Sequence, residues 1–88
     1  MIFISLGHWK QRPTKTVVAQ TIKFREAITK EGVKFLATYW TLGKYDTVNI
    51  FEAKDEKAAM KALMAGSELM KTETLVAVTR EEALKLVE

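Results

Sequence analysis

Residues 33–53 read VKFLATYWTLGKYDTVNIFEA, and this stretch decides the fold. It contains two runs rich in β-branched and aromatic residues, 33–42 and 47–53, which is the composition of β-strands. The segment between them, Gly43-Lys44-Tyr45-Asp46, is short and contains a glycine. Two strands joined in this way form an antiparallel hairpin. The stretch therefore predicts a hairpin in the middle of the chain.

A helix is predicted before the hairpin, over residues 16–31. Its apolar side recurs at the three-to-four spacing of one helical face and consists of Val17, Thr21, Phe24 and Ile28. The N-cap is Thr14 or Thr16, because threonine hydroxyls accept hydrogen bonds from the first turn. Gly32 would end the helix in a left-handed conformation.

A second helix is predicted after the hairpin, over residues 55–67. Asp55 suits its N-cap, several alanines favour helix, and Gly66 ends it. We expect its buried side to consist of Met60, Leu63 and Met64.

Two further strands, residues 1–9 and 72–79, lie outside these helices. Pro13 cannot sit inside a central strand, so the first strand stops before it. A short terminal helix is predicted over residues 80–87. Thr79 precedes it and Glu82 follows three residues later, which is the spacing of a capping box.

The elements together predict a single α+β domain over residues 1–88. Their order is strand, helix, strand, strand, helix, strand, and each crossover holds a helix and should be right-handed. This βαββαβ order gives a four-stranded antiparallel sheet with both helices on one face and the short helix at the C-terminus.

Both faces of the predicted sheet are apolar, although the helices can cover only one. We expect them to cover the more aliphatic set: Ile2, Ile4, Leu6, His8, Leu36, Thr38, Trp40, Leu42, Val48, Ile50, Val76 and Val78. The alternate set would then face outward: Phe3, Ser5, Gly7, Trp9, Phe35, Ala37, Tyr39, Thr41, Asn49, Phe51, Leu75 and Ala77. A β-bulge in any strand would exchange the two sets of residues between the two faces of the sheet. Since so large an apolar face is rarely left exposed, the sequence predicts a homodimer packed sheet to sheet.

Composition excludes several classes of protein. The chain has no cysteine and one histidine, so disulfides and thiolate or multi-histidine metal sites are excluded within one chain, and we expect no metal and no cofactor. Its net charge of +3 is spread along the sequence, which does not favour nucleic-acid binding. No apolar run approaches the ~20 residues that span a membrane, and the first residues lack a basic leader. We therefore expect a cytoplasmic protein.

Three blocks of sequence resemble the GYD-domain family. Residues 43–46 fit its Gly-x-Tyr-Asp signature, residues 52–55 (Glu-Ala-Lys-Asp) are close to its pattern, and residues 71–75 (Lys-Thr-Glu-Thr-Leu) look like its last strand. The resemblance implies a ferredoxin-like domain of the dimeric α/β-barrel superfamily. It implies no activity, because the family is functionally uncharacterised and its wider relatives include cofactor-independent oxygenases, isomerases and ligand-sensing domains.

Tyr45 and Asp46 are the first candidate site residues. In the structural interpretation, Asp46 accepts from backbone N–H groups of the hairpin turn and Tyr45 packs over its flank. In the functional one, both lie at the mouth of the barrel, where the phenol donates to a ligand and the carboxylate fixes it.

The remaining candidates are His8, Trp9, Tyr39 and Asn49. His8 could act as a general base near neutral pH, or it is a structural histidine at a strand end. Tyr39, Asn49 and Ser5 would share the dimer face with Trp9 and other aromatic residues, as a small-molecule pocket requires. Their polar groups could equally hydrogen-bond across the dimer.

The sequence alone favours a homo-oligomeric domain that binds a small ligand at the dimer barrel. The alternative is a small cofactor-independent enzyme of oxygenase or isomerase type, which requires His8, Tyr39, Tyr45 and Asp46 to converge on one cavity. A metabolite sensor acting through another protein is a third hypothesis. The terminal helix could mediate stacking into higher oligomers, or cap its own core.

Overall fold

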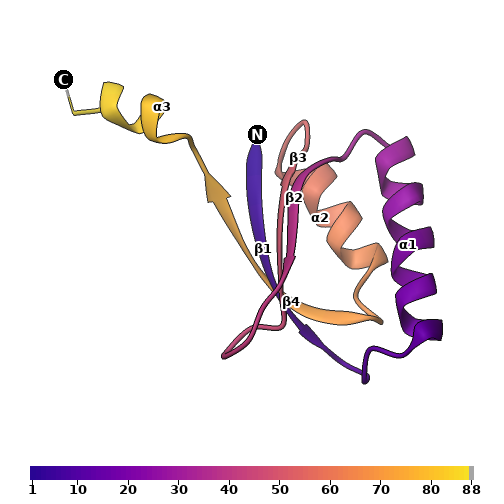
Figure 1. The fold of residues 1–88 in the computed structure, drawn as a ribbon. Coiled ribbons are helices and arrows are strands. Elements are labelled where there is room, and N and C mark those ends of the chain that lie inside the picture. Colours follow the sequence, from indigo (N-terminus) through magenta and orange to yellow (C-terminus); the bar gives the residue numbers. More distant parts are fainter. Residues whose placement is uncertain (88) are drawn as a thin grey trace.

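The structure is a computed structural model that describes residues 1–87. A four-stranded antiparallel sheet in the order β2-β3-β1-β4 carries α1 and α2 on one face (Figure 1). The elements are β1 (Ile2–Trp9), α1 (Lys15–Lys30), β2 (Lys34–Trp40), β3 (Thr47–Glu52), α2 (Glu56–Ala65), β4 (Met70–Ala77) and α3 (Arg80–Lys85). The predicted α+β architecture is confirmed.

Caps fix where the helices begin. The hydroxyl of Thr14 accepts from the N–H of Val17, and the carboxylate of Asp55 accepts from the N–H of Ala58. Thr79 caps α3 in the same way. Gly32 follows α1 with φ +106°, a left-handed value that favours glycine, as predicted. β4 begins at Met70, earlier than expected, because β1 runs on to Trp9 and Trp9 pairs with Met70.

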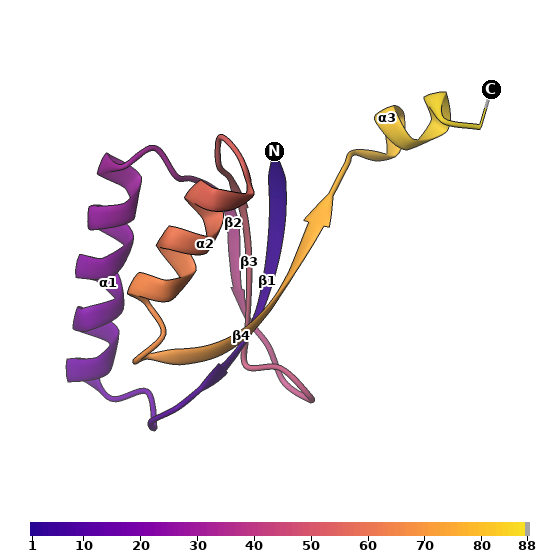
Figure 2. The same cartoon turned by 180° about the vertical axis from the view of Figure 1, so that it is seen from behind.

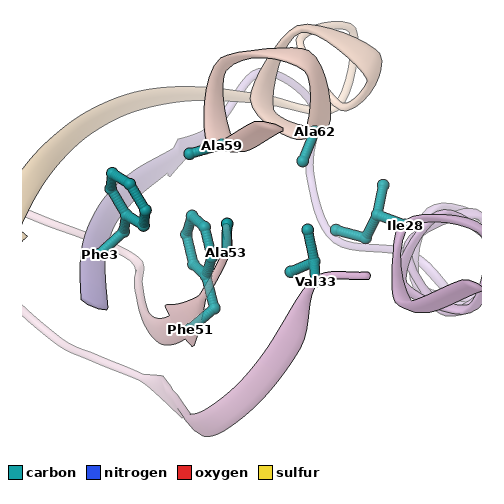
Figure 3. Close-up of a cluster of buried hydrophobic side chains, with 7 residues drawn as sticks. All are labelled: Phe3, Ile28, Val33, Phe51, Ala53, Ala59 and Ala62. Carbon is teal, nitrogen blue, oxygen red and sulfur yellow. The ribbon is translucent and has the colours of Figure 1, made fainter. Parts of the chain in front are cut away.

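The core lies between the two helices and one half of the sheet (Figure 3). The rings of Phe3 and Phe51 stack with centroids 5.4 Å apart. The rest of the buried cluster is Ile28, Val33, Ala53, Ala59 and Ala62.

The predicted buried side of α2 is wrong at two positions. Met60 and Met64 are 60% and 71% exposed, while Ala59 and Ala62 face the sheet. The physical reason is volume: two phenyl rings already fill the space below α2, so the helix contributes small side chains to the contact. Leu63 is half-buried and packs against the core, as predicted.

The predicted sheet faces are exchanged in β1 and β3. Directly paired residues of antiparallel strands share a face, and Phe3, Ser5 and Gly7 pair with Phe51, Asn49 and Thr47. This set faces the helices, whereas Ile2, Ile4, Leu6, Val48 and Ile50 lie on the open face. The aromatic rings are inside because they fill the gap between sheet and helices better than the aliphatic set.

A register shift between Phe35 and Ala37 changes which residues of β2 point to each face of the sheet. Phe35 pairs with Phe51 and Thr38 pairs with Asn49, so both lie on the helix side. Trp40 follows on the same side, as predicted, and Tyr39 lies on the open face. In β4, Val76 pairs with Phe3 and shares its face, also as predicted.

The C-terminal arm, residues 78–87, projects away from the rest of the domain (Figures 1 and 2). No residue of α3 is buried, and Leu86 and Val87 after it are 80% and 81% exposed. The terminal helix therefore does not cap its own core. Within residues 1–87, no helix is both long and apolar enough to cross a membrane.

Candidate ligand-binding cavity

A cavity of about 280 Å³ lies between α1, α2 and the sheet. It begins where the core cluster ends and runs toward the end of β1 that carries Trp9. The sheet contributes Ser5, Trp9, Phe35, Thr38, Trp40, Thr47, Asn49, Met70 and Thr72 to its wall. The helices contribute Val18, Thr21, Ile22, Phe24, Arg25 and Leu63.

The cavity exists because the side chains on the helix side of the sheet become smaller from one end of the sheet to the other. At one end Phe3 and Phe51 reach the helices, and at the other their places are taken by Ser5, Gly7 and Thr47. Gly7 is required there because an added Cβ would lie 2.6 Å from Thr47 Oγ1 and 2.7 Å from Met70 Cε. Ser5 and Thr47 line the hollow that remains under α1, which the core does not fill.

A polar cluster interrupts the apolar wall. Arg25 Nη1 donates to Asn49 Oδ1 at 3.1 Å, and Thr38 Oγ1 donates to the same oxygen at 2.8 Å. The guanidinium of Arg25 lies over the ring of Phe35, 3.9 Å from its centroid. Burial lowers the pKa of Arg25 below its ordinary value, yet a guanidinium stays charged near neutral pH. The cavity thus carries one fixed positive charge.

Two tryptophans line the cavity. Trp9 and Trp40 pack edge to face with ring centroids 5.4 Å apart, and Trp40 is 60% exposed. They are the two tryptophans of the chain.

The hairpin motif contacts one of these tryptophans through Asp46. Gly43 takes φ +103°, and Thr41 Oγ1 donates to the carbonyl of Tyr45 at 2.6 Å. The carboxylate of Asp46 accepts from the backbone N–H of Trp9 at 2.9 Å. The N–H that Asp46 satisfies therefore belongs to β1, and not to the hairpin turn as the structural interpretation expects.

Tyr45 lies on the open face of the sheet. Its hydroxyl donates to Glu73 Oε2 at 2.9 Å, and its ring is 5.1 Å from that of His8. Tyr39 lies on the same face and is 59% exposed. Of the six sequence-predicted site residues, Trp9 and Asn49 line the cavity. His8, Tyr39 and Tyr45 lie on the other side of the sheet, and Asp46 binds the backbone of Trp9.

Sequence reasoning missed Arg25 and the role of Thr38. A signal for Arg25 was present, because it follows Phe24 on α1 and lies four residues after Thr21, at the border of the apolar stripe. Within residues 1–87, no three His, Asp or Glu side chains gather where they could hold a metal ion.

The arrangement is that of a ferredoxin-like α+β domain with a ligand-sized hollow under its helices. The GYD-domain family model matches residues 3–87, and the chain therefore belongs to the GYD-domain family, as the three blocks of sequence together predict. No curated protein matches the sequence.

The solved structures that resemble the chain include the following two. One is 5-chloro-2-hydroxyhydroquinone dehydrochlorinase (TftG) from Burkholderia phenoliruptrix AC1100 in complex with 2,5-dihydroxybenzoquinone, with 16% identity over 93% of this chain and 98% of that chain and a TM-score of 0.63. The other is a dimeric ferredoxin-like protein of unknown function from Thermobifida fusca YX, with 16% identity over 86% and 89% of the two chains and a TM-score of 0.44. The similarity to the first extends to the fold alone.

Proposed function

We propose that this protein is a binding domain that holds one small, mostly apolar molecule in the cavity under α1. The observation that carries the proposal is a hollow with apolar and aromatic walls in which a few polar groups, Arg25, Asn49 and Thr38, converge. This combination is the usual composition of a small-molecule site. We place the ligand under the helices, and not in a barrel between two sheets, because the hollow lies there.

The size of the cavity limits the ligand. A hollow of about 280 Å³ is close to the lower end of known ligand pockets. A cavity of about 150 Å³ is enough to bind benzene in an engineered protein. The ligand is accordingly one substituted ring, or an aliphatic molecule of similar volume.

Binding is favoured over acid–base catalysis by the residues that line the cavity. Within the described chain, the wall contains no His, Asp, Glu, Lys or Tyr, and Arg25 is its one titratable group. An arginine does not exchange its proton near neutral pH. An enzyme of the alternative type would need a proton-transferring group that this wall lacks.

Self-association is the second part of the proposal. The open face carries Ile4, Leu6, Val48 and Ile50, and Leu75 beside them is 52% exposed. Burial of apolar surface contributes about 25 cal/mol per Å², so a second sheet packed on this face would stabilise both copies. The domain then works as a homodimer whose two ligand cavities lie on its outer sides.

Ligand binding can be tested by filling the cavity. Thr21 lines the hollow, so Thr21→Phe should abolish binding of small aromatic probes, which quench the fluorescence of Trp9 and Trp40 in the unchanged protein. Ala27→Phe is the matched control, because Ala27 is exposed on the same helix and outside the cavity. Equal quenching in both variants, with unchanged circular dichroism, would reject the site.

A further inference from the structure

No acidic side chain of residues 1–87 pairs with the charge of Arg25. Within residues 1–87, the single ion pair joins Lys61 and Glu31 at 3.9 Å, and no acidic residue lines the cavity. A partly buried cation without an anion is unfavourable, because burial removes water that would otherwise solvate the charge. The cavity is therefore poorly suited to a cationic ligand and well suited to an anionic one.

Arg25 is also held in a fixed orientation. Its guanidinium plane lies against Phe35, and one of its N–H groups is bound by Asn49. A guanidinium has five N–H donors, so donors remain after this contact. An arginine fixed in this way can donate to a carboxylate with little further loss of side-chain freedom.

Asn49 adds a second donor beside the guanidinium. Its carbonyl oxygen accepts from both Arg25 and Thr38, which orients the amide group. Its amide nitrogen donates to no protein atom in the part of the chain that the structure describes. A guanidinium and an amide N–H₂ next to each other form a site for oxygen atoms that carry negative charge.

The walls around this polar cluster are aromatic. Phe24 lines the cavity from α1, Phe35 lines it from β2, and Trp9 and Trp40 also line it. Aromatic side chains pack favourably against flat rings, through stacked or edge-to-face contacts.

Building on the proposed function, we infer that the ligand is a planar aromatic anion, such as an aromatic carboxylate or an ionised phenol. Its negative oxygen binds Arg25 and Asn49, and its ring lies between Phe35 and the two tryptophans. A neutral molecule of the same shape fills the cavity but leaves the guanidinium unpaired, so it binds more weakly.

The test compares benzoate with benzamide, which have the same ring and differ in charge at pH 7. Quenching of Trp9 and Trp40 reports binding in the wild-type protein, in Arg25→Gln and in Lys23→Gln. Lys23→Gln is the matched control, because it removes one positive charge from the same helix at an exposed position outside the cavity. We expect benzoate to bind wild type and Lys23→Gln about tenfold more tightly than benzamide. Arg25→Gln should lose this preference while still binding benzamide.

The outcomes distinguish a preference for anionic ligands from ligand binding in the cavity as such. Equal affinity for benzoate and benzamide in the wild type, or an unchanged preference in Arg25→Gln, overturns the anionic ligand and leaves the cavity as a binding site. Failure of both probes to bind the wild type rejects the cavity and the anion together. A loss of preference in Lys23→Gln as large as in Arg25→Gln would assign the effect to net charge and also overturn the inference.

Discussion

The carboxylate of Asp46 and the backbone N–H of Trp9 are joined by a hydrogen bond of 2.9 Å that connects the residue before β3 to β1. Regular pairing of these strands ends at Gly7 and Thr47, and the N–H of Asp46 donates to the carbonyl of Gly7. The side chain of Asp46 thus adds one hydrogen bond to β1 beyond the last directly paired residues, Gly7 and Thr47. The aspartate of the family motif thereby fixes the backbone of a residue that lines the cavity.

Removing this carboxylate should destabilise the domain. Asp46→Ala leaves the partly buried N–H of Trp9 without its partner, and we expect the free energy of unfolding to fall by about 1–3 kcal/mol. Urea denaturation followed by circular dichroism measures the change. Asp46→Asn keeps an acceptor oxygen and should recover most of the loss. Equal stability of Asp46→Ala and wild type would contradict this role.

Gly7 is expected to tolerate no side chain. The methyl group of Gly7→Ala would overlap Thr47 Oγ1, and overpacking of this kind costs about 1–3 kcal/mol. Thr47→Ala removes one of the two overlapping atoms, and the other, Met70 Cε, ends a flexible side chain, so the double variant should be less destabilised than the sum of the two single variants. Thermal unfolding of all four proteins gives the comparison, and strict additivity would show that the contact does not limit this position.

The open sheet face is expected to hold two copies together. Ile4 lies on this face and pairs with Ile50 and Leu75, so Ile4→Asp places a charge in the middle of the apolar surface. Analytical ultracentrifugation should detect a dimer for wild type and a monomer for this variant. Ala27→Asp on the exposed side of α1 is the control and should remain dimeric. A monomeric wild type at micromolar concentration would reject the interface.

The C-terminal arm should contribute little to the stability of a single copy. No residue of α3 is buried, so truncation after Val78 is expected to change the free energy of unfolding by less than about 0.5 kcal/mol under conditions where the domain is monomeric. Measuring Ile4→Asp with and without the arm provides such conditions. A large loss would show that the arm packs against its own domain.

Arg25 should not be needed for folding. Arg25→Met keeps an apolar stem beside Phe35 and removes a poorly solvated charge, so we expect stability within about 1 kcal/mol of wild type, or higher. Urea denaturation tests this. A loss above about 2 kcal/mol would indicate that Arg25 serves the fold and not a ligand.

Local signals were sufficient for the order of the elements. Threonine and aspartate caps, the glycine after α1 and the hairpin motif each act within a few residues, and all are present where the sequence predicts them. The faces of the sheet depend instead on which side chains fit under the helices. The fit depends on the volume available between elements that are distant in sequence. For this reason Phe3 and Phe51 face the helices, although the sequence predicts that they face outward.

The cavity could not be predicted for the same reason. Ser5 and Asn49 were recognised as polar residues among aromatics, but the exchange of faces moves them from the open side of the sheet to the helix side. Arg25 comes from α1, far from Asn49 in sequence, and no local pattern links the two. Only the packing of α1 over β2 and β3 brings them within hydrogen-bond distance.

A crystal structure of the protein soaked with benzoate would show whether an aromatic anion binds beside Arg25. We expect one ring in the hollow under α1, with its carboxylate within hydrogen-bond distance of Arg25. A hollow closed by side chains, or benzoate found only on the open face of the sheet beside His8 and Tyr45, would contradict this expectation.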